Sequence, residues 1–186
     1  MSHGHALFTS PIYPVLAYAN AFVGSVLGLA CTRRLLTRGP RHGWNWLLGG
    51  AVALGCGIWG MHFIAMLGYS PNGITPRYDV PLTALSMVVA IAIVGLGILA
   101  IALRPSWLTV LGGGVVCGVG IAAMHYIGMA AMAVPGSVSY DPQRVLLSVG
   151  VAVVAASGAL AATMLTAGRT VTAAAALVMA GSRQRS

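Results

Sequence analysis

Two Met-His pairs stand inside long apolar stretches of the sequence, where an ionisable side chain is costly and is by default a candidate functional group. Each histidine is followed four residues later by another methionine. On a helix, residues four apart lie on one face, so each imidazole would have a thioether one turn away. The candidate metal ligands are therefore His62, Met66, His125, Met129, Met61 and Met124.

Neutral imidazole and soft thioether form a ligand set that suits copper, particularly Cu(I), and this set lacks the carboxylates that magnesium, calcium or manganese would favour. Two histidines would also suffice for bis-imidazole ligation of b-type haem. A third interpretation is purely structural, with methionines that fill the core and histidines that bond to neighbouring helices. All three interpretations stay open at this point.

Four further residues are secondary candidates for the same site. Tyr126 and Met132 follow the second histidine in its apolar stretch. His3 and His5 stand in Ser-His-Gly-His near the N-terminus and could complete a copper site, although incidental histidines in a mobile terminus are the alternative.

The composition places these pairs in a lipid bilayer. Of 186 residues, 58% are apolar and only 6% are charged, whereas about a quarter of the residues of a soluble domain are charged. Because a span needs about 20 apolar residues, we expect an all-α, polytopic transmembrane bundle. Its five spans are Ile12–Cys31, Trp44–Gly68, Val80–Leu103, Trp107–Val134 and Val145–Ala167. The first is expected to be an anchor without a cleaved signal, and 170–181 a short, incomplete sixth span.

Arginine is distributed unequally between the two sides of the membrane. Lys and Arg remain on the cytoplasmic side, and eight of the ten arginines fall on one predicted side: Arg33, Arg34, Arg38, Arg41, Arg104, Arg169, Arg183 and Arg185. The N-terminus is therefore predicted outside, with Tyr69, Tyr78 and Tyr140 at the outer interface. Basic residues do not cluster with aromatic ones, so nucleic-acid binding is not expected.

The chain contains an internal repeat. A shift of 63 residues aligns 41–66 with 104–129, with 13 of 26 positions identical, and a Tyr-Asp pair follows each copy, at 78–79 and 140–141. We expect a single membrane domain, 1–186, with repeats over 41–81 and 104–142 and an incomplete third unit over 169–181. The repeat also contains small residues that let helices approach closely, and we assign helix packing to Gly55, Gly57, Gly118 and Gly120.

The duplicated Gly-x-Gly-Ile-x-x-Met-His segment resembles the motif of the MHYT domain family, a bacterial integral-membrane sensor module. The resemblance covers about residues 8 to 180. It implies three such motifs near the outer face of the cell membrane, copper bound by Met and His, and sensing of O2, CO or NO. Here Ile64 and Ile127 replace the motif threonine, Phe63 replaces the first tyrosine, and no third Met-His pair occurs, so we expect a shortened member.

We therefore expect a non-enzymatic, multi-pass sensory and signalling module of the bacterial inner membrane. Its expected partners are the bilayer, a second copy of itself and a cytoplasmic signalling protein. The chain has no lysine, two carboxylates in loops and no Ser or Cys beside either histidine of the Met-His pairs, so acid-base or nucleophilic catalysis is not expected. The alternatives are a transporter of a metal or small solute, and a bis-histidine haem protein for electron transfer.

Overall fold

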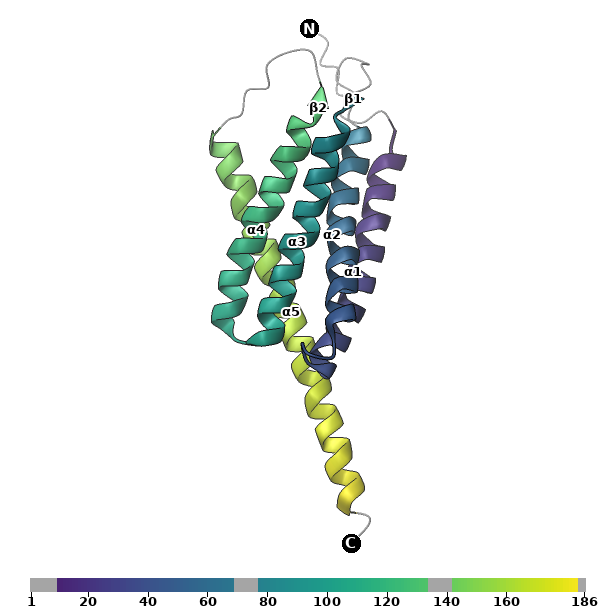
Figure 1. The fold of residues 1–186 in the computed structure, drawn as a ribbon, viewed down its shortest axis with the longest axis vertical. Coiled ribbons are helices and arrows are strands. Elements are labelled where there is room, and N and C mark those ends of the chain that lie inside the picture. Colours follow the sequence, from purple (N-terminus) through teal and green to yellow (C-terminus); the bar gives the residue numbers. More distant parts are fainter. Residues whose placement is uncertain (1–9, 69–76, 134–141, 184–186) are drawn as a thin grey trace.

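The computed structural model describes residues 10–68, 77–133 and 142–183, and it is an all-α bundle (Figure 1). Two very short strands also occur. The elements in chain order are α1 (Ile12–Arg38), α2 (Trp44–Leu67), β1 (Arg77–Tyr78), α3 (Val80–Leu103), α4 (Trp107–Ala130), β2 (Met132–Ala133) and α5 (Pro142–Arg183). All five helices contain a segment long and apolar enough to cross a membrane. The expected multi-pass bundle is therefore confirmed.

The largest differences between the helix boundaries and the predicted spans occur at three places. Helix α1 continues to Arg38, because the arginines at its end prolong the helix beyond the apolar segment. Residues 131–133, predicted as helix, form a turn and β2 instead, since β2 pairs with β1. Residues 170–181, predicted to open a sixth span, are the last part of α5.

Helix α5 is continuous over 42 residues, or about 63 Å at 1.5 Å per residue. Its sequence from 166 to 183 contains no proline and includes four consecutive alanines, the residue with the highest helix propensity. Nothing in this segment therefore favours a turn before a further span. Figure 1 shows α5 leaving the bundle and extending well beyond the other helices.

Glycines lie where the helices cross. A β-carbon at Gly55 would lie 2.6 Å from Cα of Ile91 on α3, and one at Gly118 would collide with the backbone of Val153 on α5. Gly57 contacts Gly24 on α1, and Gly120 contacts Ile93 on α3, so in each copy the first glycine faces the following helix and the second the preceding one. The same packing arrangement therefore occurs twice, once in α1–α2–α3 and once in α3–α4–α5, and α3 belongs to both.

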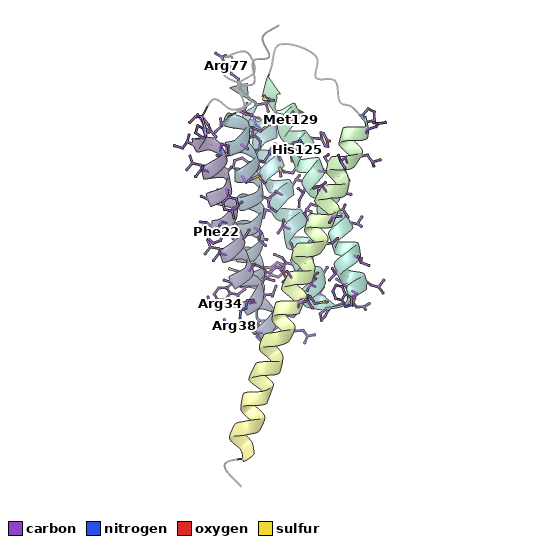
Figure 2. All side chains as sticks on the ribbon, turned by 180° about the vertical axis from the view of Figure 1, so that it is seen from behind. Phe22, Arg34, Arg38, Arg77, His125 and Met129 are labelled. Carbon is purple, nitrogen blue, oxygen red and sulfur yellow. The ribbon has the colours of Figure 1, made fainter. Side chains whose placement is uncertain are left out.

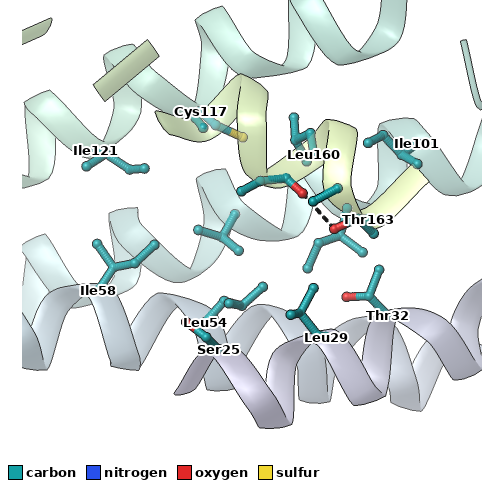
Figure 3. Close-up of a pocket in the computed structure, with 15 residues that line it drawn as sticks. Ser25, Leu29, Thr32, Leu54, Ile58, Ile101, Cys117, Ile121, Leu160 and Thr163 are labelled. Carbon is teal, nitrogen blue, oxygen red and sulfur yellow. Dashed lines mark hydrogen bonds between the residues drawn. The ribbon is translucent and has the colours of Figure 1, made fainter. Parts of the chain in front are cut away.

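An apolar cavity of about 190 Å³ lies between the helices (Figure 3). All five helices contribute to its wall, with Leu54 and Ile121 among the lining residues and neither histidine of the Met-His pairs. Its two threonine hydroxyls, of Thr32 and Thr163, bond to carbonyls one turn back in their own helices. The cavity is therefore separate from the candidate ligands.

The two ends of the bundle differ in charge. We call the end that carries β1 and β2 the strand end, and the opposite end the arginine end. Figure 2 shows Arg77 at the strand end and Arg34 and Arg38 at the other. The guanidinium carbons of Arg34 and Arg38 lie 4.4 and 5.6 Å from the ring centroid of Trp46, so both cations pack on this ring at the arginine end.

Candidate metal centre

His62 of α2 and His125 of α4 meet at the centre of the candidate site. Their Nδ1 atoms are 3.3 Å apart and their ring centroids 4.7 Å apart. Each histidine lies five residues before the end of its helix, which is about 7 Å below the strand end of the bundle. The structure therefore brings the two duplicated imidazoles together at one depth.

The two imidazoles form an asymmetric pair. Because Nδ1 faces Nδ1, one ring donates its N–H and the other accepts with its lone pair, so two neutral rings are in opposite tautomers. Nε2 of His62 is buried and has no hydrogen-bond partner among the described residues. A buried polar group left in this state costs about 1–3 kcal/mol. This unsatisfied nitrogen is on the opposite edge of the His62 ring from the contact with His125.

Gly128 on α4 has no side chain, and the imidazole of His62 occupies the space beside it. A β-carbon at this position would lie 3.1 Å from Nε2 of His62 and 3.1 Å from Cζ of Phe63. Helix α3 packs against both α2 and α4, whereas α2 and α4 have few contacts with each other. Gly128 therefore permits the direct α2–α4 contact at the level of the histidines.

The four candidate methionines are not equivalent. Met124 is 1% exposed and lies one turn from Gly128, on the face of α4 that contacts His62. Met61 has an exposed side chain on the outside of α2. Met66 and Met129 are half-buried, one turn beyond their histidines toward the strand end, and Figure 2 shows Met129 near His125. Met124 is thus placed toward the site and Met61 away from it.

The secondary candidates are placed in different ways. The hydroxyl of Tyr126 is 3.0 Å from Oγ of Ser148 on α5, and its ring contacts the imidazole of His125 with centroids 5.2 Å apart. Met132 lies in β2 and pairs with Tyr78 of β1 in the antiparallel ladder. His3 and His5 lie outside the described residues.

The donor set fits a small metal ion. Two nitrogens bound to one tetrahedral ion are about 3.3 Å apart when each bond is about 2.0 Å, which equals the separation of the two Nδ1 atoms. No group of three His, Cys, Asp or Glu side chains occurs in the described part of the chain. A further ligand would therefore be a thioether or another group of the strand end.

Comparison with known families identifies the repeat. Residues 55–114 and 118–178 each match the MHYT family, described as a bacterial signalling protein N-terminal repeat. The chain belongs to the MHYT family. The two matches begin 63 residues apart, at the offset that aligns the two Met-His pairs, and together they cover well over half of the chain. The resemblance inferred from the motif is confirmed.

Curated MHYT relatives are larger proteins. The chain is 39% identical over 144 residues to the bifunctional diguanylate cyclase/cyclic di-GMP phosphodiesterase MucR of Pseudomonas aeruginosa, matching 75% of this chain and 20% of the relative. It is 42% identical over 164 residues to the cyclic di-GMP phosphodiesterase NbdA of the same species, matching 86% of this chain and 20% of the relative. The signalling protein YkoW of Bacillus subtilis is 30% identical over 141 residues, which cover 75% of this chain and 17% of that protein.

The chain therefore spans about a fifth of the length of the curated relatives it matches. No solved structure matches it. The family places this chain among bacterial membrane signalling proteins, while the enzymatic activities in the names of MucR and NbdA belong to those longer proteins.

Sequence reasoning missed two residues of this region. Gly128 has no marker in the sequence, because its counterpart in the first copy is Ala65 and the repeat does not select it. Tyr78 could have been found from the sequence, because a Tyr-Asp pair follows each copy of the repeat. The sequence analysis instead places Tyr78 at the membrane interface. In the structure its hydroxyl is buried, and burial raises the pKa of Tyr78. Asp79 accepts a hydrogen bond from the backbone of Leu82 and caps α3.

Proposed function

We propose that this MHYT chain is the sensory module of a bacterial signalling system and binds copper through His62 and His125. The observation that carries the proposal is the 3.3 Å approach of the two Nδ1 atoms. Ionisable side chains inside a membrane bundle are costly, and helix packing alone does not require two imidazoles from different helices to meet there.

The chain's own residues define how copper would be held. His62 and His125 supply nitrogen, and the methionines with the most suitable placement are Met124, Met66 and Met129. This mixture of imidazole and thioether selects Cu(I) over harder ions. When bound, Cu(I) would supply affinity for diatomic gases such as O2, CO and NO. A haem is less favoured, because ring centroids 4.7 Å apart leave no room for a porphyrin between the imidazoles.

Helix α5 offers a route from the site to the arginine end. Tyr126 follows His125 directly, and its hydroxyl bonds to Ser148 of α5, so a displacement of α4 at the site reaches α5 through this contact. Helix α5 then runs without interruption past the bundle to Arg183. We propose that the strand end faces the outside of the inner membrane, and that α5 passes the signal to the cytoplasmic side.

The proposed output is control of another signalling unit, with cyclic di-GMP turnover suggested by the names of MucR and NbdA. The module itself is proposed to be non-enzymatic. Transport is less favoured, because substrate sites in transporters are typically formed by discontinuous helices, whereas α2 and α4 are continuous around both histidines.

The proposal is tested by elemental analysis and an optical spectrum of the protein purified in detergent, beside the double variant His62→Ala/His125→Ala. We expect copper in near-stoichiometric amount in the wild type and its loss in the double variant. Met124→Leu and Met61→Leu form a matched pair: the first should weaken copper binding, because Met124 is buried on the site face of α4, and the second should not.

Three results would contradict the proposal. A Soret band that is present in the wild type and absent from the double variant would show that the histidines bind haem and not copper. Copper retained by the double variant would show that the ion binds elsewhere. If the wild-type protein is folded and contains neither metal nor chromophore, the histidine pair is only a packing contact.

A further inference from the structure

The apolar cavity between the helices extends to the membrane-facing surface of the bundle. Two of its lining residues, Ile98 of α3 and Cys117 of α4, are only 4% and 5% exposed. Other lining residues are exposed, among them Leu29 of α1 and Ala159 of α5. Helices α1 and α5 have far fewer contacts with each other than α1 has with α2. The cavity therefore reaches from the interior of the bundle to its surface between α1 and α5.

The wall of this cavity offers little to a polar ligand. The hydroxyls of Thr32 and Thr163 donate to carbonyls of their own helices, and the thiol of Cys117 lies 3.5 Å from the carbonyl oxygen of Ile93. The remaining hydroxyl, that of Ser25, belongs to an exposed residue at the mouth. A buried water needs about two to four polar partners, so a cavity of this kind stays dry. Its occupant must be apolar.

The cavity is elongated along the bundle axis (Figure 3). Its lining runs from Ser25 to Thr32 on α1 and from Ala156 to Thr163 on α5, a rise of about 10 Å on each helix. Its volume of about 190 Å³ exceeds the roughly 150 Å³ of a dry apolar cavity that binds benzene. A space of this length and volume has room for one alkyl chain of several carbons.

The bilayer supplies such chains at the mouth of the cavity. Lipid acyl chains are the solvent around a membrane-spanning bundle, so they surround α1 and α5 and outnumber any dissolved apolar solute. Because lipid tails are as apolar as leucine, a chain that enters meets a matching wall and has no polar group to desolvate. An empty cavity, in contrast, deprives its lining atoms of dispersion contacts. An acyl chain is therefore the occupant that the position of the mouth favours.

We propose that this cavity is a binding site for the end of a lipid acyl chain, which enters between α1 and α5. The site lies one helical turn below the histidine pair, because Ile58 and Ile121 line it and precede His62 and His125 by four residues each. A chain bound there packs against both α1 and α5, so the position of α5 in the bundle depends on the lipid as well as on α4. The inference does not assume copper at the histidines.

The test is photocrosslinking of the full chain in lipid nanodiscs, with a phospholipid that carries a diazirine near the end of one acyl chain. Labelled residues are mapped by mass spectrometry after irradiation. In the wild type we expect label on Ile98 and Cys117, which a chain reaches only inside the cavity, and on the exposed Val154. Met124 is at least as deeply buried but does not line the cavity, and it should remain unlabelled.

Two variants of α5 test the route of entry. Ala159→Phe places an aromatic ring at the mouth, and the labels on Ile98 and Cys117 should be lost while that on Val154 remains. Gly158→Phe is the matched control, because it adds the same ring one residue away, where nothing lies within 4 Å of a β-carbon. It should label as the wild type does. Unaltered labels in Ala159→Phe, or equal losses in both variants, would overturn entry between α1 and α5.

The wild type alone also tests the site, so the proposal does not depend on whether a variant folds. Label on Val154 with none on Ile98 or Cys117 would show that lipid chains stay outside the bundle. Label on Met124 equal to that on Cys117 would show that the reagent reaches buried residues without the cavity. Either result would refute the lipid site and leave the proposed copper site untouched, since neither measurement involves metal.

Discussion

Gly128 of α4 lies directly against the imidazole of His62 on α2, and a β-carbon there would be only 3.1 Å from Nε2. A separation between 3.0 and 3.4 Å is tighter than nearly all real β-carbon contacts, so the imidazole would have to move by a few tenths of an ångström. The counterpart of Gly128 in the first copy is Ala65. The duplicated sequence thus forms a site with two different halves.

Gly128→Ala should weaken metal binding without unfolding the bundle. The added methyl group displaces His62 from its position opposite His125, and such disturbances of ligand orientation cost about 10–100-fold in metal affinity. The measurement is a chelator-competition titration. Gly112→Ala is the control on the same helix, because nothing lies within 4 Å of its β-carbon. Equal affinity in both variants would argue against a role for Gly128 in placing His62.

Gly118→Leu should destabilise the fold itself. Any β-carbon at Gly118 collides with the backbone of Val153, so α4 and α5 must separate, and overpacking typically costs about 1–3 kcal/mol or more. We expect a lower Tm in detergent and less folded protein. Gly112→Leu changes the same helix by the same volume in open space and should keep the Tm of the wild type. A normal Tm for Gly118→Leu would contradict the α4–α5 crossing.

Tyr78 should make the metal-free protein less stable at high pH. Burial raises the pKa of its hydroxyl above the ordinary value of 10.0, so the folded state retains the phenolic proton more strongly than the unfolded state. That contribution is fully present below pH 10 and is lost as the pH rises through the folded-state pKa. Tm should fall less steeply above pH 10 in Tyr78→Phe than in the wild type. Tyr18→Phe, at a largely exposed position, is the control, and an identical slope in all three would refute the prediction.

Single cysteines should report the orientation of the bundle. With Cys31, Cys56 and Cys117 changed to alanine, His42→Cys marks the arginine end and Arg77→Cys the strand end. Because arginine is retained on the cytoplasmic side, a membrane-impermeant maleimide should label position 77 in intact spheroplasts and position 42 only in inverted vesicles. The reverse pattern would place the histidine pair near the cytoplasm and contradict an external input.

The membrane spans were predictable because hydrocarbon imposes one local rule, that backbone polar groups be satisfied within the segment. Helix α3 begins and ends at the predicted residues, Val80 and Leu103. At the end of α4 the prediction differed from the structure because partners far apart in the chain decide the outcome. Residues 131–133 leave the helical conformation as β2 pairs with Arg77 and Tyr78, and no local pattern records that pairing.

The sequence by itself determined the apolar spans, the unequal arginines and the duplication that marks His62 and His125 as candidates, since all of these are properties of residue type and spacing. Only the tertiary structure decided that the two Nδ1 atoms are 3.3 Å apart, that Met124 is buried while Met61 is exposed, and that Tyr126 reaches α5. Both copies have the same periodicity, but each helix packs against different neighbours. Which face of a helix is turned inward therefore depends on contacts between helices and not on the repeat.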